Sequence, residues 1–430
     1  MSLTGLSARD MREDLAFLAG EWARRDSSFG PTERRGFRAL VERAMEEVEH
    51  LDPLGFWMRV SHAVALARNG HTNVNAGAPP FSGLPLRFWW FKDGLFVVEA
   101  APSCSGLLGA RVEKIGRATA LQALSAVSAY ISGNGPRIRC VSPRYLRIPG
   151  LLHRLGITES DREVPLTLRG PDGRRRSVRV PLDRSRDPRR NQSEEWAVLI
   201  PAAPGQRDRW VHVLDRVPRR PLAFEPATDL DSRWLSTGRK ILYIRSNWLS
   251  GASGDDLSLA WKFVGLIPSE VVPKRPRAVI VDLRFNSGGN FGNTILFAQA
   301  LPKLMRRGEH VFVLVSPSTF SAAIVTVALL KDAGGPKVRI LGTNVGDNER
   351  FWAEGPPIAL PRSGLRIQPA PELQDWAKGG SDPDRYFWAN VVWGPKRRIS
   401  LRPEIIVEPT FAEYASGRDP VLERALALTR

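Results

Sequence analysis

Residues 311–324 read VFVLVSPSTFSAAI, and this stretch decides the fold class. The apolar residues 311–315 predict a buried strand, the polar turn SPST follows, and Ser321 opens a predicted helix that reaches Asp332. A strand that passes through a short turn into a helix is the building unit of a parallel α/β sheet. We therefore expect an α/β domain here, with Ser321 at a helix N-terminus.

Ser321 is a candidate nucleophile because of this position. A helix N-terminus favours developing negative charge, and an unbonded amide such as that of Ala322 could donate to an oxyanion. Serine is also a favoured helix N-cap, so an ordinary capping role stands as the alternative. The stretch alone does not separate the two.

A second stretch, VIVDLRFNSGGN at residues 279–290, predicts a buried strand that runs into a glycine pair. Glycine lets the backbone approach a ligand closely and adopt turns that other residues avoid. The amides of Gly288 and Gly289 are therefore candidates for the other half of an oxyanion hole. A phosphate-binding loop is disfavoured because neither GxGxxG nor GK[ST] is present, and a plain strand-to-helix turn stands as the alternative.

The chain around these stretches alternates between strands and helices. Strands are predicted at 241–244, 278–283 and 338–341, and helices at 257–267 and 294–305. This alternation indicates largely parallel pairing.

The upstream half of the chain has a different pattern of predicted helices and strands. Three predicted helices begin near residues 8, 31 and 53, and residues 83–182 then change to short β-like runs with one helix at 118–131. The pattern predicts three regions and one polar linker. These are a helical region at 1–78, a small β domain at 79–185, an α/β core at 196–430, and a linker at 183–195.

His71 follows the third predicted helix, in the run Arg68-Asn-Gly-His71-Thr72. A general base needs a pKa near the working pH and must reach the nucleophile in space, whatever their separation in sequence. We therefore take His71 as the candidate base for Ser321. The other five histidines fit structural roles.

Composition excludes several classes of protein. The net charge of +17 suggests nucleic acid as a possible class of partner. The basic clusters, however, are spread out and lack zinc-finger spacing or an RNA-binding aromatic signature. No apolar run approaches the roughly 20 residues that span a bilayer. We therefore expect neither a specific nucleic acid partner nor a membrane-spanning protein.

Cys104 and Cys140 fit one disulfide or two buried thiols, and they form no metal-binding or redox motif.

Three motifs together resemble the core of the tail-specific, or C-terminal processing, serine peptidases. They are DLRFNSGG at 282–289, STFSAA at 318–323 and LGTNVG at 341–346. The Gly70-His71-Thr72 element and the runs RPEIIVE at 402–408 and GRDPVLE at 417–423 look more like the tricorn-core and retinoid-binding-protein branch. The resemblance extends from about Leu66 to the C-terminus.

This resemblance implies a PDZ-like β domain that holds a peptide C-terminus, and a crotonase/ClpP-like α/β peptidase core with a mostly parallel sheet. It implies Ser321 as the nucleophile, and Ala322 with Gly288 or Gly289 as the backbone oxyanion hole. The substrate would be a polypeptide, and no metal or organic cofactor is required.

The chain departs from the resembled families near the expected base. The lysine-using branch has Phe-Gly-Lys where this chain has Val345-Gly346-Asp347, so the resemblance favours His71 over a lysine. Gly70 stands where the tricorn branch has a serine, and Arg397-Arg398 stands where that branch has Glu-Asn. The acid that would orient His71 is thus unassigned. The candidates are Glu354, Asp347 and Asp332, the last matching an aspartate of the lysine-using branch.

We interpret the chain as a serine endopeptidase, with two alternatives. One is a peptide-binding relative with weak or no hydrolysis, which the unassigned acid favours. The other is a crotonase-like enzyme acting on acyl-CoA thioesters, which the STFS run and the PDZ-like region disfavour.

No basic segment followed by an apolar one opens the chain, so we expect no signal peptide in it. Because such relatives are commonly exported, we expect a periplasmic or secreted location. The oligomeric state is not indicated.

Overall fold

The computed structural model describes residues 3, 5–183, 194–202, 210–236, 240–251 and 256–429. Most of the predicted linker at 183–195 lies outside the described residues. The chain divides into two compact units. The first unit consists of Met1–Asp215 and Phe351–Leu373, and the second of Arg216–Arg350 and Gln374–Arg430. Residues 351–373, which the sequence pattern assigned to the core, belong to the first unit.

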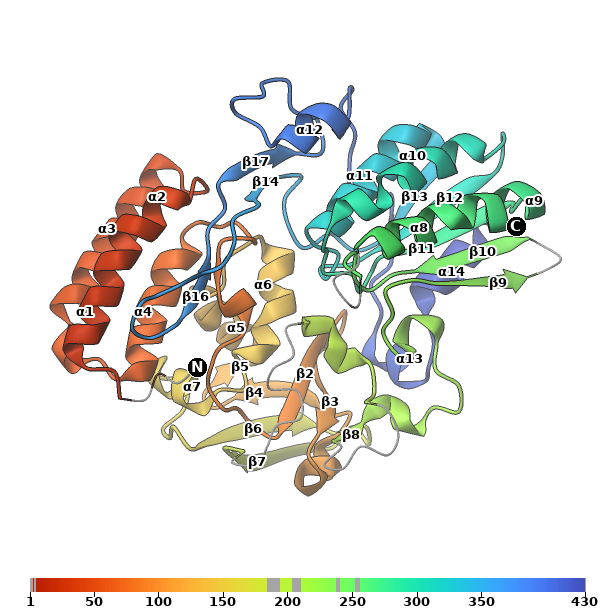
Figure 1. Cartoon of the computed structure of the whole chain (residues 1–430). Helices are drawn as coiled ribbons and strands as arrows, with labels where there is room; N and C mark the ends of the chain where they lie inside the picture. The colour runs from red at the N-terminus through yellow and green to blue at the C-terminus, as the bar shows by residue number, and fades with distance from the viewer. Residues whose placement is uncertain are drawn as a thin grey trace. The chain divides into compact units, whose positions relative to one another are not determined.

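The first unit opens with the predicted helices, drawn in red to orange in Figure 1. The first of them starts at a capping box of Ser7 and Asp10 and includes a π-helical turn at Leu18–Trp22. The other two begin at Pro31 and Pro53, as expected for proline in a first helical turn. The helices are α1 (Ala8–Phe17), α2 (Ala23–Arg25), α3 (Pro31–Glu46) and α4 (Pro53–Ala65).

An antiparallel sheet forms the β domain of the first unit. Its strand order is β2-β3-β4-β6-β7, with β5 paired to β4 and β8 paired to β3. The strands are β2 (Leu86–Phe91), β3 (Gly94–Ala100), β4 (Arg111–Ile115), β5 (Ala118–Thr119), β6 (Glu163–Arg169), β7 (Arg175–Pro181) and β8 (Val211–His212). The accompanying helices are α5 (Ala120–Ser128), α6 (Gly135–Val141) and α7 (Pro149–Arg154). The predicted small β domain is confirmed.

A three-stranded sheet joins two distant parts of the first unit. Its order is β1-β16-β15, and all pairs are antiparallel. The strands are β1 (Asn73–Val74), β15 (Ile358–Ala359) and β16 (Arg366–Gln368). Because β1 starts two residues after His71, this pairing explains why residues 351–373 belong to the first unit.

The second unit contains the α/β core. Its six-stranded sheet has the order β18-β13-β12-β11-β10-β9, parallel throughout except for the antiparallel strand β9. The strands are β9 (Asp231–Ser236), β10 (Ile241–Arg245), β11 (Ala278–Asp282), β12 (His310–Val315), β13 (Val338–Gly342) and β18 (Ile405–Ile406). The predicted, mostly parallel sheet is confirmed.

Helices pack against this sheet. Val421, Leu422 and Ala425 of α14 form one buried cluster with Tyr243, Ile280 and other strand residues. The helices α10 and α11 contact each other, and α8 contacts α10 (Figure 1). The helices are α8 (Asp256–Leu266), α9 (Val272–Lys274), α10 (Ile295–Leu304), α11 (Ala322–Gly334), α12 (Trp388–Trp393), α13 (Phe411–Ala415) and α14 (Pro420–Ala427). The chain passes between the units through the paired strands β14 (Arg350–Ala353) and β17 (Glu372–Asp375).

Two expectations from composition can be compared with the structure. Cys104 and Cys140 are present as thiols rather than as a disulfide. Across the described ranges, no helix combines the length and the apolar character that a membrane crossing requires.

Candidate active site

Loops that follow three parallel strands build the candidate site within the second unit. Because β10, β11 and β12 are parallel neighbours, their carboxyl ends meet at one edge of the sheet, where open α/β sheets hold their ligands. The glycine loop, residues 283–290, follows β11, and the serine turn, residues 316–321, follows β12. The topology therefore brings together two stretches that the sequence singled out separately.

The serine turn is closed by its own side chains and fastened to the glycine loop. Ser316 N donates to Thr319 Oγ1 at 3.0 Å, and Thr319 N donates back to Ser316 O at 2.9 Å. The Thr319 hydroxyl donates to Leu283 O at 2.7 Å, and the Ser316 hydroxyl donates to Arg284 O. The polar run SPST thus fixes the backbone that leads into Ser321.

Ser321 has a backbone conformation that is unusual for a serine. Its φ is 53° and its ψ is −126°, a strained region for a residue with a side chain. Its side chain makes no capping hydrogen bond to the first turn of α11, so it does not act as an ordinary N-cap. A strained serine between a strand and a helix is the geometry of an exposed nucleophile.

Gly288 lies against Ser321 at a distance that only glycine permits. A Cβ added at Gly288 would lie 2.6 Å from the Ser321 Cβ and 3.1 Å from the Ala322 nitrogen. Gly288 has a φ of 105° and Gly289 a φ of 127°, both in the region that favours glycine. Both glycines are therefore required by the backbone, and Gly288 also by its contact with the serine.

The amides around Ser321 differ in their hydrogen bonds. Gly288 N donates to Asn286 Oδ1 at 3.0 Å and is thus engaged within its own loop. The amides of Gly289 and Ala322, by contrast, donate to no acceptor in the described parts of the chain. Ala322 directly follows Ser321, and Gly289 directly follows the glycine that contacts Ser321, so both unbonded amides are candidates for an oxyanion hole.

Asn286, which the sequence pattern did not assign to the site, holds the glycine loop. Its side chain is fully buried and donates to Ser246 O at 3.0 Å and Ser246 Oγ at 3.1 Å. Its backbone oxygen accepts from Phe320 N at 3.0 Å. Asn286 therefore ties the glycine loop both to the loop after β10 and to the serine turn.

A buried ionic network anchors the other end of the glycine loop. Arg284 donates to Asp282 Oδ1 at 2.9 Å and to Asp419 Oδ1 at 2.7 Å, and Tyr243 donates to Asp282 Oδ2 at 2.8 Å. Burial alone would raise the pKa of Asp282, but the Arg284 guanidinium outweighs it and the pKa is lowered. Asp419 also caps α14 through Leu422 N at 3.0 Å. The GRDP motif thus connects the C-terminal helix to the DLR motif.

His71 lies in the first unit, in a turn closed by a 3.0 Å bond from Thr72 N to Asn69 O. Its ring stacks on Phe351, with the ring centroids 5.0 Å apart and an interplanar angle of 13°. Asn73 Nδ2 donates to His71 O at 3.0 Å. Phe351 therefore packs against one face of the imidazole, and the bonds of Thr72 and Asn73 hold the backbone of the turn, all within the first unit.

The three candidate acids occupy different places. Asp332 lies three turns along α11, about 16 Å from Ser321 by helical rise. This distance is too great for its carboxylate to contact a histidine that is hydrogen-bonded to Ser321. Asp347 is buried and follows Gly346, whose amide donates to Thr319 O at 3.0 Å. Glu354 is exposed, has a φ of 73°, and lies in the unit of His71, three residues after Phe351.

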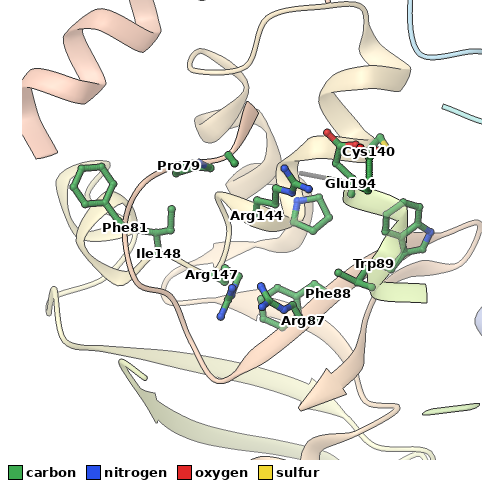
Figure 2. A pocket seen from close by; sticks show the side chains of 14 residues that line it. Pro79, Phe81, Arg87, Phe88, Trp89, Cys140, Arg144, Arg147, Ile148 and Glu194 are labelled. Carbon is green, nitrogen blue, oxygen red and sulfur yellow. The ribbon is translucent and has the colours of Figure 1, made fainter. Parts of the chain in front are cut away.

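A pocket in the β domain contains none of the predicted site residues. Figure 2 shows Arg87 and Arg147 on one side of it, and Arg144 near Glu194 on another. Phe81, Phe88 and Trp89 supply apolar surface. The pocket carries charges of both signs, and Arg87 and Arg147 each stack on Trp210. Arg87 and Arg147 therefore contribute to the packing of the domain.

Comparisons with known proteins show the fold. No protein-family model matches the sequence, and no curated protein is significantly similar to it. The crystal structure of mature CPAF has 13% identity and a TM-score of 0.60, covering 98% of this chain and 98% of that one. Mature CPAF complexed with lactacystin has 14% identity and a TM-score of 0.57, covering 98% and 99%. The tricorn protease is less similar, with 15% identity, a TM-score of 0.41 and coverage of 98% and 37%. Over the 98% of the chain that the match covers, the fold is similar to that of mature CPAF.

Proposed function

We propose that the chain is a serine endopeptidase that hydrolyses polypeptides, with Ser321 as its nucleophile. The observation that carries the proposal is the geometry of Ser321. Its backbone is strained at the N-terminus of α11, its hydroxyl does not cap the helix, and two unbonded amides lie in the neighbouring backbone. This arrangement fits acyl transfer rather than a structural role.

In the proposed mechanism, the Ser321 oxygen attacks the scissile carbonyl while the His71 imidazole accepts the hydroxyl proton. The amides of Ala322 and Gly289 donate to the resulting oxyanion, since that of Gly288 is engaged with Asn286. Each such donor contributes about 3 kcal/mol to transition-state stabilisation. The imidazolium then protonates the leaving amine. A water molecule, deprotonated by His71, hydrolyses the acyl-enzyme and restores both residues.

Several observations support the proposal. The motifs DLRFNSGG and STFSAA resemble the tail-specific peptidases, and the structure packs the two motifs together at one sheet edge. The helix dipole of α11 favours negative charge at Ser321. The β domain would hold the substrate C-terminus as a PDZ-like module. Glu354 is the candidate third acid in the unit of His71, and export from the cytoplasm remains part of the proposal.

The first test replaces Ser321 by alanine and measures hydrolysis of casein. We expect the Ser321→Ala variant to lose about a thousandfold or more in turnover while keeping the wild-type melting temperature. The matched control is Ser7→Ala, which removes a serine that does cap its helix. This control should lose a little stability and no activity.

Two results would contradict the proposal. One is wild-type turnover of casein by Ser321→Ala. The other is turnover of acyl-CoA thioesters without any cleavage of casein, which would indicate the crotonase-like alternative.

A further inference from the structure

We propose that Asp26 is a positioning residue for His71, acting through Thr72 and Asn69. The inference rests on the proposed function, because it assumes that the orientation of the imidazole matters for catalysis. It adds Asp26, a residue of the first helical region 45 positions upstream of the histidine, to the residues that support the proposed catalytic base. Every contact that carries it lies within the first unit.

Asp26 is a buried carboxylate surrounded by donors. Its side chain is 2% exposed. One carboxylate oxygen accepts from Ser28 N at 2.9 Å and from the Ser28 hydroxyl at 2.6 Å. The other accepts from Ala370 N at 2.8 Å and from the Thr72 hydroxyl at 3.1 Å. The carboxylate therefore connects the end of α2, the segment after β16 and the residue that follows His71.

The site is built for a carboxylate rather than for an amide. Each oxygen receives a backbone N–H, which can only donate, so an asparagine would place its own NH2 group against one of these donors. Arg34 donates to the Asp26 backbone oxygen at 2.8 Å, which leaves both carboxylate oxygens to the four donors. Burial raises the pKa of Asp26, and the bonds from Ser28, Ala370 and Thr72 oppose this effect. A buried acid is costly, which favours a specific role for it.

Thr72 is the connection between Asp26 and the histidine turn. It is fully buried, and its hydroxyl also lies 2.9 Å from Ser28 Oγ and accepts from Asn69 Nδ2 at 3.1 Å. Asn69 and Thr72 are the two ends of the turn that contains His71. The hydroxyl of Thr72 thus fixes both ends of this turn relative to Asp26.

Asn69 extends the network to the ring that stacks on His71. Its Nδ2 donates to Trp352 O at 2.9 Å, and its Oδ1 accepts from Trp352 N at 3.0 Å. This pair of bonds holds the backbone next to Phe351, whose ring packs on the imidazole. The same network therefore sets the position of the histidine turn and of the aromatic surface that orients its ring.

The experiment uses Thr72 variants of the full chain, because Asp26→Asn could fail to fold. Thr72→Val keeps the shape of the side chain and removes the hydroxyl, and Thr72→Ser retains it. The matched control is Thr158→Val, which deletes another buried threonine hydroxyl of the first unit, bonded to Ser160 O at 2.9 Å. Each variant is assayed for kcat and KM on a fluorogenic peptide. The rate of carbethoxylation of His71 by diethyl pyrocarbonate is measured by mass spectrometry, with the exposed His50 as internal reference.

We expect Thr72→Val to lower kcat about tenfold to a hundredfold with little change in KM, since misplacing a catalytic group affects the chemical step. The ratio of His71 to His50 modification should rise severalfold in this variant. Thr72→Ser should restore both quantities to near the wild-type values, and Thr158→Val should leave both unchanged.

The two proposals fail in different ways. If the wild type cleaves peptides but Thr72→Val matches it in kcat and in His71 modification, the positioning role of Asp26 is wrong and the peptidase proposal stands. If the wild type cleaves nothing, the peptidase proposal is wrong. The modification ratio then still tests the positioning, because it requires no activity, and an unchanged ratio would overturn it.

Discussion

The backbone at Ser321 is the clearest residue-level sign of chemistry in the molecule. A serine that only capped α11 would adopt an extended conformation, as Ser7 does before α1 with a φ of −79° and a ψ of 161°. Ser321 instead has a φ of 53°, and its side chain makes no capping hydrogen bond to α11. Strain of this kind, of order 1–3 kcal/mol, persists where the surrounding structure imposes it, and here the serine turn and the glycine loop do so.

Gly288 gives a residue-level prediction. Gly288→Ala would place a Cβ 2.6 Å from that of Ser321, at a φ of 105°. We expect it to lower the free energy of unfolding by about 2–4 kcal/mol and to remove casein hydrolysis, because the serine must shift. Urea denaturation and the casein assay measure the two effects.

Gly265→Ala is the matched control for Gly288→Ala. Gly265 lies within α8, and a Cβ added there meets nothing within 4 Å. This variant should gain about 0.5–1 kcal/mol and keep its activity. Equal effects of the two substitutions would mean that Gly288 has no special contact with the serine.

At the same scale, the sequence predicts some site residues and misses others. Ser321, Gly288 and Gly289 could be singled out because each follows a predicted apolar strand within a motif that resembles the tail-specific peptidases, although serine and glycine are by themselves ordinary turn residues. Asn286 was visible in the DLRFNSGG motif, but its role depends on Ser246, 40 positions upstream. Asp26 gives no sequence signal, because its partners Thr72 and Ala370 come together only through folding.

At the scale of elements, the apolar runs of β10 to β13 and the helices between them are predictable. Burial on both faces makes most of their residues apolar, as in the first four residues of β11, AVIV. The short strands β1, β15 and β16 are not predictable, since two or three residues carry no periodicity. Their pairing, such as Val74 with Ile367, comes from tertiary contacts. For this reason, the assignment of residues 351–373 could not be foreseen.

The buried network between β11 and α14 gives an element-level prediction. Arg284→Met would leave Asp282 and Asp419 buried without their cation, and we expect a loss of about 3–5 kcal/mol at neutral pH in urea denaturation. The exposed pair Arg9–Glu13 offers a control, and Arg9→Met should change little. A similar small effect of both substitutions would contradict an anchoring role of Arg284.

The pH dependence of this variant follows from the sign of the pKa shift. In the wild type the pKa of Asp282 is lowered, so its stabilising contribution is present above the ordinary value of 3.8 and is lost as the pH falls through the folded value. Without Arg284, burial remains and favours the protonated acid. The stability difference between wild type and Arg284→Met should therefore be largest near neutral pH and shrink as the pH falls through about 4.

At the scale of the whole molecule, the proposed chemistry requires both units. Ser321 and the amides proposed for the oxyanion hole belong to the second unit, and His71, with Asp26 and Thr72, belongs to the first. Catalysis by a dyad of this kind would make activity depend on the folding of residues from nearly the whole chain.

The most direct test of the central claim is labelling by a fluorophosphonate, followed by intact-mass measurement and peptide mapping. A fluorophosphonate reacts with a serine only where a base activates it. We predict one adduct per chain, located on Ser321, and at least about a hundredfold slower labelling of His71→Ala. An adduct on another residue, or labelling of Ser321 at the same rate without His71, would contradict the account.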